Sequence, residues 1–356
     1  MRFANVLPAP YTRRMRYFGR KYSDNTATVL PPCVKQSLHM YPRQSIILNQ
    51  LQPKHKPSGM NTVDTSLPIG FCVDRLTRFY KAIPMSVTIK TETDIAHMRV
   101  ACRLASEVLD YIAPFIKAGI STGELDRMIN DYMVNVQKTV SATLGYQPPG
   151  YPPYPKSCCI SLNDVICHGV PSDDKILKNG DILNIDVTII TPEGYFGDTS
   201  RMFTVGEPSI AAKRLCDVTY ECMWLGIAQV KEGATLGDIG AAIAAHAHAN
   251  GMSVVREYCG HGIGKVFHEE PQVLHYVVKG QGMKLKAGMI FTIEPMINAG
   301  KRDLRTMSDG WTVKTKDRSL SAQWEHTVLV TPTGYEVLTL SDGYPALPEF
   351  IKTTRC

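Results

Sequence analysis

The hydrophobic pattern of the chain changes near residue 85. Residues 1–84 are rich in Pro, Asn, Gln and Ser and have no sustained periodicity, which is typical of a disordered or loosely ordered segment. In Ser86–Lys90, apolar and polar residues then alternate as in a short strand. Thr91 and Asp94 predict a capping box at the start of a helix. The apolar face expected for this helix is Ile95, Met98, Ala101, Leu104, Val108 and Ile112.

A ten-residue pattern occurs twice, 114 residues apart. The two copies are Ile116–Leu125 (IKAGISTGEL) and Val230–Ile239 (VKEGATLGDI). Each copy follows an amphipathic helix and caps the next helix. In the first copy, Ser121 and Glu124 are the expected capping residues. Gly with Ser or Thr suits any turn between helices, but the extent of the match favours a duplicated half-domain. Each half continues into strands, at 182–205 in the first and at 289–297 and 321–331 in the second. Helices followed by strands predict an α+β domain with helices against an antiparallel sheet.

Two aspartates lie inside segments that otherwise alternate as strands. Asp186 is in 182–190 and Asp198 is in 195–203, so the two segments are candidates for a hairpin. A turn centred on Pro192 would place Asp186 opposite Asp198, whereas a shift of one residue would put them on opposite faces. If this face is buried, two ionised carboxylates on it need a positively charged partner. If the face is solvated, water screens the charges and no partner is needed.

The second half adds further acids in strand-like segments. Glu294 lies in 289–295, Glu325 lies in 321–330, and His261 is flanked by glycines. Carboxylates with one imidazole suit Mn²⁺, Fe²⁺, Co²⁺ or Zn²⁺ better than a structural thiolate site. The number of carboxylates also suits two ions, a pair that promotes hydrolysis. No two of these residues have the spacing of an H-E-x-x-H motif.

Composition narrows the class of protein. The 356 residues are 44% hydrophobic and 20% charged, as in a soluble globular protein of one large or two ordinary domains. No apolar run reaches the roughly 18 residues of a membrane span, and residues 1–30 lack a secretory signal. The ten cysteines include no C-x-x-C pair, and a chain of this length folds without disulfides, so we expect a reducing compartment.

The positive charge is concentrated near the N-terminus. Residues 1–63 contain ten Lys or Arg and one acid, a net of +9, which leaves −3 for the rest of a chain whose total is +6. Such a segment is compatible with a nucleic-acid-binding arm, an organelle-targeting leader or an unstructured extension. The mildly acidic remainder gives no indication of nucleic-acid binding.

Seven further stretches occur in order along the chain. They are SLNDVICHGVP (161–171), NIDVT (184–188), GDTS (197–200), GHGIG (260–264), FHEEP (267–271), FTIEPM (291–296) and QWEHT (323–327). Together they resemble type I methionine aminopeptidases of peptidase family M24, and the resemblance runs from about Met85 to Leu340. The resemblance implies the pita-bread (creatinase/aminopeptidase) fold. In it two pseudo-symmetric α+β halves pack helices on a curved antiparallel sheet around a dinuclear metal site.

The resemblance also implies roles for individual residues. The implied ligands of two divalent ions (Co, Mn, Fe or Zn) are Asp186, Asp198, His261, Glu294 and Glu325, with Asp198 and Glu325 bridging. Asp186 would serve one ion, and His261 with Glu294 the other. Glu294 is the implied general base, and His168 and His268 would contact the scissile amide and stabilise the tetrahedral intermediate.

A methionine-selective pocket is implied beside the metals. Its expected walls are Tyr154, Cys159, Phe267 and Trp311. Asn184, Val187 and Ser321 match a peripheral monovalent-cation site.

The chain departs from the family in two places. The loop between Gly145 and Ser157 has about five additional residues, mostly Pro and Tyr, so either Tyr146 or Tyr151 could take the outer pocket position. Residues 1–84 form an extension without the zinc fingers of longer eukaryotic forms. We expect a catalytic domain at 85–345 and a tail at 346–356.

The implied activity is removal of the initiator methionine from peptides and nascent chains whose second residue is small. We expect a monomer that acts in the cytoplasm, at the ribosome for nascent chains, without binding nucleic acid or membrane. Residues 1–84 would be dispensable there, or would direct the enzyme to a mitochondrion or plastid as a transit peptide. Rival interpretations are a proline-specific peptidase, which usually has a separate N-terminal domain, and the type II enzyme, which has a long helical insertion. A metal-free binding module is disfavoured because all five implied ligands are present.

Overall fold

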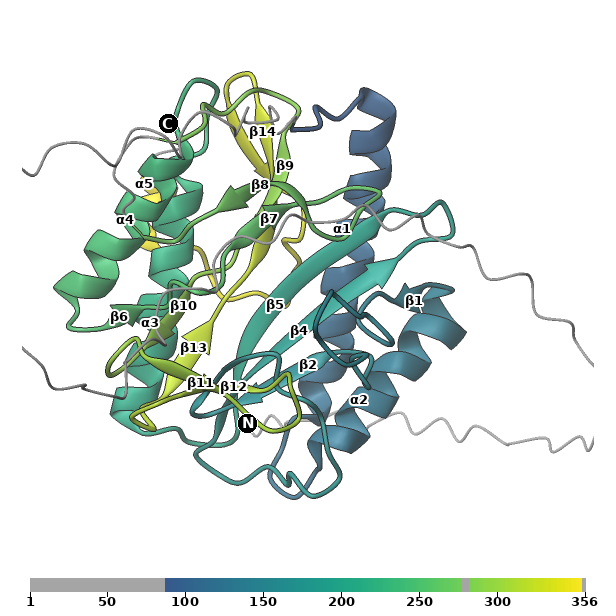
Figure 1. Ribbon diagram of the computed structural model, residues 1–356, viewed down its shortest axis with the longest axis vertical. Coiled ribbons are helices and arrows are strands. Elements are labelled where there is room, and N and C mark those ends of the chain that lie inside the picture. The colour runs from purple at the N-terminus through teal and green to yellow at the C-terminus, as the bar shows by residue number, and fades with distance from the viewer. Residues whose placement is uncertain (1–86, 277–281, 354–356) are drawn as a thin grey trace, which may run out of the picture. The chain divides into compact units, whose positions relative to one another are not determined.

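The computed structural model describes residues 87–276 and 282–353 (Figure 1). The predicted extension, Met85 and Ser86 lie outside these residues. The domain boundaries at 84 and 345 stay predictions. The helices are α1 (Glu92–Ile112), α2 (Thr122–Asp131), α3 (Ile210–Ile227), α4 (Leu236–Ala249) and α5 (Glu349–Thr353), with a 3₁₀ turn η1 (Ala113–Phe115) and a π-helical turn η2 (Tyr132–Gln137). Among the described residues, no helix is long and apolar enough to cross a membrane.

All the paired strands in the described residues are antiparallel, as the sequence predicts. The strands of the first half are β1 (Val140–Ser141), β2 (Cys159–Leu162), β3 (Val165–Cys167), β4 (Ile182–Ile190) and β5 (Phe196–Thr204). Those of the second are β6 (Ser253–Val254), β7 (Gly260–Gly262), β8 (Glu269–Val273), β9 (Ile290–Ile293), β10 (Met296–Asn298), β11 (Leu304–Thr306), β12 (Val313–Thr315), β13 (Ser321–Gln323), β14 (His326–Thr331) and β15 (Gly334–Val337). One sheet contains β1, β2, β4 and β5, another has the order β15-β14-β9-β7-β8, and two three-stranded sheets have the orders β13-β10-β6 and β11-β12-β3.

The predicted repeat is a structural repeat. Ser121 caps α2 and Thr235 caps α4, and the glycine two residues before each cap has a positive φ, 95° and 85° respectively. Each glycine amide donates to a leucine carbonyl, Gly119 to Leu177 and Gly233 to Leu285, both at 2.9 Å. The two halves therefore fold by the same local rules, which confirms the duplicated α+β architecture.

Each half has its own apolar core. In the first, α1 packs on the apolar face of β4. The side chains of this face, Leu183, Ile185, Val187 and Ile189, are all fully buried. In the second, α3 and α4 pack on residues of β9, β13 and β14. Figure 1 shows these strands between α1 on one side and α3 with α4 on the other. Within the predicted tail, Ile351 of α5 is buried in the second core.

The capping box that opens α1 is formed as predicted. Asp94 N donates to Thr91 Oγ1 (3.2 Å), and Thr91 N donates back to Asp94 Oδ2 (3.0 Å). Hydrogen bonds from Thr91 and Tyr195 lower the pKa of Asp94 from 3.8 to about 2. The contribution of this carboxylate to stability is therefore complete above its ordinary pKa of 3.8 and is lost as the pH falls through about 2.

We expect Thr91→Ala to lower the free energy of unfolding at neutral pH by about 1 kcal/mol, because it leaves the amide of Asp94 without its cap. Urea denaturation followed by circular dichroism measures the change. Thr93→Ala is the matched control, since Thr93 is exposed two residues farther along the same helix. A Thr91→Ala protein as stable as Thr93→Ala would contradict the prediction.

Three local predictions need correction. Residues 87–90 form no strand; Lys90 N makes a single backbone hydrogen bond to Gly288 O (2.8 Å). The segment 289–297 is two strands, interrupted at Glu294 and Pro295, where proline has no amide to donate. The segment 321–331 is likewise interrupted at Trp324 and Glu325, where Glu325 N donates instead to Ser200 O (3.2 Å) in the other half.

Candidate active site

The β4–β5 hairpin brings two aspartates to one cavity, although not in the predicted register. Asp186 pairs with Ser200 and Asp198 with Thr188, so the turn is centred on Glu193 rather than on Pro192. The reason is the turn itself, in which Gly194 has a φ of 81° and donates to Thr191 O (2.9 Å). The register differs by two residues, an even number, so both carboxylates stay on the same face and line the same cavity.

The histidine between glycines, His261, lies in the short strand β7. A Cβ at Gly260 would lie 2.2 Å from Thr292 O, and one at Gly262 would lie 2.2 Å from Glu270 O. Only glycine lets β7 fit between β8 and β9 at these two points. His261 Nδ1 is 3.0 Å from Gly262 O, and because a carbonyl only accepts, Nδ1 carries the hydrogen. The other nitrogen, Nε2, is therefore the one available to a metal.

Both strand interruptions place a glutamate in the cavity. Glu294 Oε1 accepts from Thr292 Oγ1 (2.7 Å), and Oε2 accepts from Gln323 Nε2 (3.3 Å). The Glu294 amide donates to Nε2 of the buried His275 (3.1 Å), so that the main chain is held at the break. Glu325 is held across the two halves, because its carbonyl accepts from Thr199 Oγ1 (2.9 Å).

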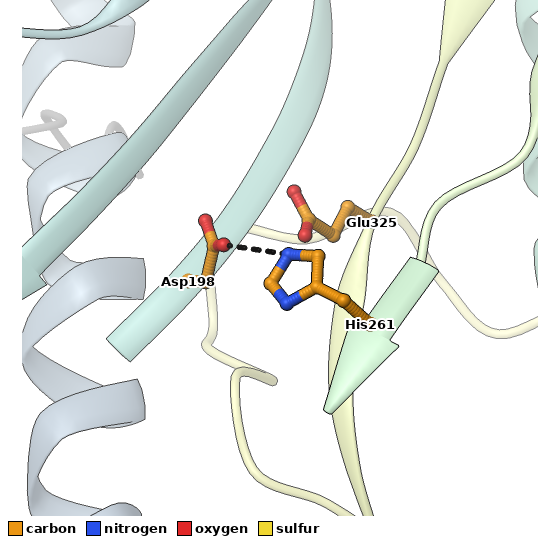
Figure 2. A group of neighbouring side chains, drawn as sticks. All are labelled: Asp198, His261 and Glu325. Carbon is orange, nitrogen blue, oxygen red and sulfur yellow. Dashed lines mark ion pairs between the residues drawn. The ribbon is translucent and has the colours of Figure 1, made fainter. Parts of the chain in front are cut away.

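Asp198, His261 and Glu325 meet at one point, from three separate segments of chain (Figure 2). One ligand atom of each lies within 4.8 Å of those of the others. His261 Nε2 is 3.5 Å from Asp198 Oδ2 and 3.7 Å from Glu294 Oε1. The fifth predicted ligand, Asp186, lines the same cavity. All five therefore converge, although they are up to 139 positions apart in the sequence.

The cluster is a site of uncompensated negative charge. Burial and the charges of Asp198 and Glu294 raise the pKa of Asp186 well above its usual value, and burial with the charge of Asp198 does the same for Glu325. Burial also raises the pKa of Glu294 to about 7. None of the described residues that line the cavity is Lys or Arg. Oxygen donors with one imidazole and no protein cation fit divalent metal ions.

The whole cavity has a volume of about 320 Å³, within the range of ligand sites, and extends from this cluster into an aromatic pocket. The predicted walls Tyr154, Cys159, Phe267 and Trp311 all line it. Tyr154, Cys159 and Trp311 form a separate buried cluster, and Trp311 meets Tyr154 edge to face at 5.1 Å. The pocket is thus apolar next to a strongly acidic cluster.

The predicted catalytic histidines line the same cavity. His168 adopts a φ of 54°, unusual for a residue with a side chain, at the end of β3. Burial lowers its pKa to about 4, so the ring is neutral at neutral pH. Burial also lowers the pKa of His268, whose Nδ1 lies 3.0 Å from Tyr146 Oη.

The three residues predicted for a monovalent-cation site lie in β4 and β13, and this site stays a prediction. Asn184 and Val187 are three residues apart in β4, so their side chains point to opposite faces of the sheet. Val187 is fully buried in the first core, whereas Asn184 Nδ2 donates to Gln323 O (2.8 Å). Ser321 lies in β13, where its amide donates to Asn163 O (2.9 Å).

Some residues of the cavity were not predicted. They are Thr143, Pro148, Thr188, Glu257, Tyr258, Cys259 and Met296. Both candidates for the outer position, Tyr146 and Tyr151, line the cavity. Cys259 adjoins the stretch 260–264, and Thr188 and Met296 lie within the stretches 184–188 and 291–296, so these motifs could have indicated them. The buried His275 behind Glu294 had no local signal, because only the tertiary fold brings it there.

Comparisons with known proteins agree with this architecture. Residues 96–332 match the family described as metallopeptidase family M24. The chain is 60% identical over 265 residues to the methionine aminopeptidase of Escherichia coli K12, covering 74% of this chain and 98% of the relative. The crystal structure of methionine aminopeptidase from Rickettsia prowazekii aligns with a TM-score of 0.68 at 50% identity, covering 72% and 100%. The prolidase of Pyrococcus furiosus aligns over 71% of this chain and 66% of its own with a TM-score of 0.55 at 23% identity, which shows the shared fold alone.

Fold and site together define a metal-dependent peptidase with the pita-bread fold. The chain belongs to metallopeptidase family M24, and within it to the type I methionine aminopeptidases. It is therefore a hydrolase of a family that binds divalent metal, and the group formed by Asp198, His261 and Glu325 could hold such an ion.

Proposed function

We propose that this site removes the N-terminal methionine from peptides and nascent chains whose second residue is small. The observation that carries the proposal is the junction of two environments in one cavity. An acidic cluster adjoins the apolar pocket of Tyr154, Cys159 and Trp311, and the described residues that line this cavity include no Lys or Arg. The first suits metal-assisted hydrolysis, and the second suits an unbranched thioether side chain.

Two divalent ions would be held by the five converging side chains. Asp198 and Glu325 would bridge them, Asp186 would bind one, and His261 with Glu294 the other. Bound there, the ions supply Lewis-acid activation of water and of the scissile carbonyl. Mn²⁺, Fe²⁺, Co²⁺ and Zn²⁺ all suit this donor set. The buried carboxylates could stay ionised beside the positive charge of such ions.

The remaining catalytic roles fall to the chain itself. Glu294 accepts a proton from the attacking water and passes it to the leaving amine. The neutral ring of His168 can donate a hydrogen bond to the developing tetrahedral centre, and His268 contacts the scissile amide from the other side. Phe267 and Trp311 exclude larger or branched side chains from the methionine pocket.

Three broader features are proposed from the resemblance. The enzyme would act as a monomer, it would act in the cytoplasm, and its nascent substrates would reach it at the ribosome. Residues 1–84 would then be dispensable for catalysis.

Metal-stripped protein should not release methionine from Met-Ala-Ser, and activity should return with at least one of Mn²⁺, Co²⁺, Fe²⁺ or Zn²⁺ added singly. A Gly-Pro dipeptide, the kind of substrate a proline-specific peptidase would accept, should stay intact throughout. Release of free methionine measured by chromatography, with metal content by mass spectrometry, tests both parts. Activity that persists without metal would contradict the proposed chemistry, and cleavage of Gly-Pro alone would contradict the proposed substrate.

A further inference from the structure

The loop 147–153 has its two ends joined by hydrogen bonds at the wall of the cavity. Gly145 N donates to Tyr154 O, and Tyr154 N donates to Tyr146 O, both at 2.8 Å. The seven residues between Tyr146 and Tyr154 therefore leave the wall of the cavity and return to it at the same place.

The loop is shaped by its own sequence. Tyr151 N donates to Pro148 O (3.1 Å), and Gly150 has a φ of 88°. Proline at the second position, here Pro149, and glycine with positive φ at the third are the requirements of a type II turn. The side chain of Gln147 donates to Tyr151 O (3.2 Å) across the turn. Four of the seven residues are prolines, which restrict the backbone further.

Trp311 anchors the loop to the second half of the protein. Its Nε1 donates to Pro152 O (3.0 Å), and its backbone amide donates to Asp309 Oδ1 (2.9 Å). A Cβ at Gly310 would lie only 3.1 Å from the Pro152 ring, so glycine lets the loop approach this closely. The indole of Trp311 is therefore bonded to the loop, and its main chain is fixed by Asp309.

The loop extends the aromatic wall of the pocket outward. The ring centroids of Tyr154 and Tyr151 are each 5.1 Å from that of Trp311. Tyr154 is 2% exposed, whereas Tyr151 is 43% exposed, so Trp311 separates a deep ring from a ring at the mouth. Tyr151 and Pro148 both line the cavity. The loop has no charged residue, and thus it adds an apolar surface to the cavity.

We propose that Tyr151, with Pro148 and the outer edge of Trp311, forms a subsite for the third residue of the substrate and favours an aromatic or large apolar side chain there. In an extended peptide, residues two apart point the same way and are roughly 6.8 Å apart. A methionine on the Tyr154 side of Trp311 therefore directs the third side chain toward Tyr151, while the small second residue faces the opposite wall. The inference rests on the proposed methionine pocket.

The test compares kcat/KM for Met-Ala-Phe with that for Met-Ala-Gly. We expect the wild-type enzyme to prefer Met-Ala-Phe by roughly 2- to 12-fold, the size of one aromatic contact. Tyr151→Ala should bring the ratio close to 1, and Tyr151→Phe should retain it because the ring is kept. Leu144→Ala is the matched control, since Leu144 is 54% exposed just before the loop and does not line the cavity; it should leave the ratio unchanged.

Two results would overturn the subsite. One is a wild-type enzyme without preference between the two tripeptides. The other is a Tyr151→Ala enzyme that loses activity equally on both, because the ring would then only shield the methionine. Leu-Ala-Phe, compared with Met-Ala-Phe, separates this inference from the pocket on which it rests. If the enzyme strongly prefers Met-Ala-Phe to Leu-Ala-Phe, but Tyr151→Ala leaves the ratio of kcat/KM for Met-Ala-Phe to Met-Ala-Gly unchanged, the subsite alone is ruled out. If the enzyme does not prefer Met, the methionine pocket and the subsite are both ruled out.

Discussion

Glu294→Gln is expected to lower kcat for methionine release by roughly 10²–10⁴-fold, the range for loss of a general base. Glutamine keeps the shape of the side chain and can still accept the hydrogen bond from Thr292, but it cannot take a proton from water. The fold should survive the change. Burial raises the pKa of Glu294 to about 7 in the metal-free site, so removing this carboxylate removes a charge that burial disfavours.

The measurement is steady-state hydrolysis of Met-Ala-Ser together with thermal unfolding and metal content of the same preparation. Glu193→Gln provides the control, since Glu193 is exposed in the β4–β5 turn and should behave as wild type. A loss of activity with metal retained supports the base, and a loss of one ion per chain supports the ligand role. Full activity in Glu294→Gln would rule out both.

His168→Ala should lower kcat by roughly 10²–10³-fold, as when one donor to a tetrahedral intermediate is removed, with a smaller effect on KM. Burial lowers the pKa of His168 to about 4, so its ring stays neutral, with one N–H to donate, at every pH above that value. The folded-state pKa is below the ordinary 6.5, so titration of this ring should cause no loss of kcat between pH 5 and 8.

The kcat of the variant is measured on Met-Ala-Ser across that pH range. His248→Ala is a suitable control, because His248 is exposed in the last turn of α4. Wild-type turnover in His168→Ala would remove the residue from the mechanism. An acid limb near pH 6.5 that disappears in the variant would show that the ring is charged during catalysis.

Part of this protein was predictable because the relevant physics is local. A capping box joins residues three apart, so Thr91 and Asp94 predict the start of α1 from their spacing alone. Side chains of a strand alternate, so the apolar face of β4 follows from its sequence. The repeated turn also needs only neighbouring residues, namely a glycine with positive φ and a capping hydroxyl. The types of the five acidic and imidazole residues likewise indicated a metal before any geometry was known.

The remaining features depend on contacts between distant segments. The observed register of the hairpin differs from the predicted one by two residues. The position of Gly194 in the turn, rather than the alternation of side chains, decides which residues face each other. Alternation also could not show where long strands break, since Glu325 leaves its ladder to bond Ser200 of the other half.

What the sequence by itself determined, then, is the chemical content of the site and the local elements that carry it. The tertiary structure alone decided which of those side chains share a centre. It brought Asp198, His261 and Glu325 together and placed Tyr151 on Trp311. The physical reason is that residue type and spacing act over a few positions, whereas strand register and the packing of the two halves are settled by the whole core at once.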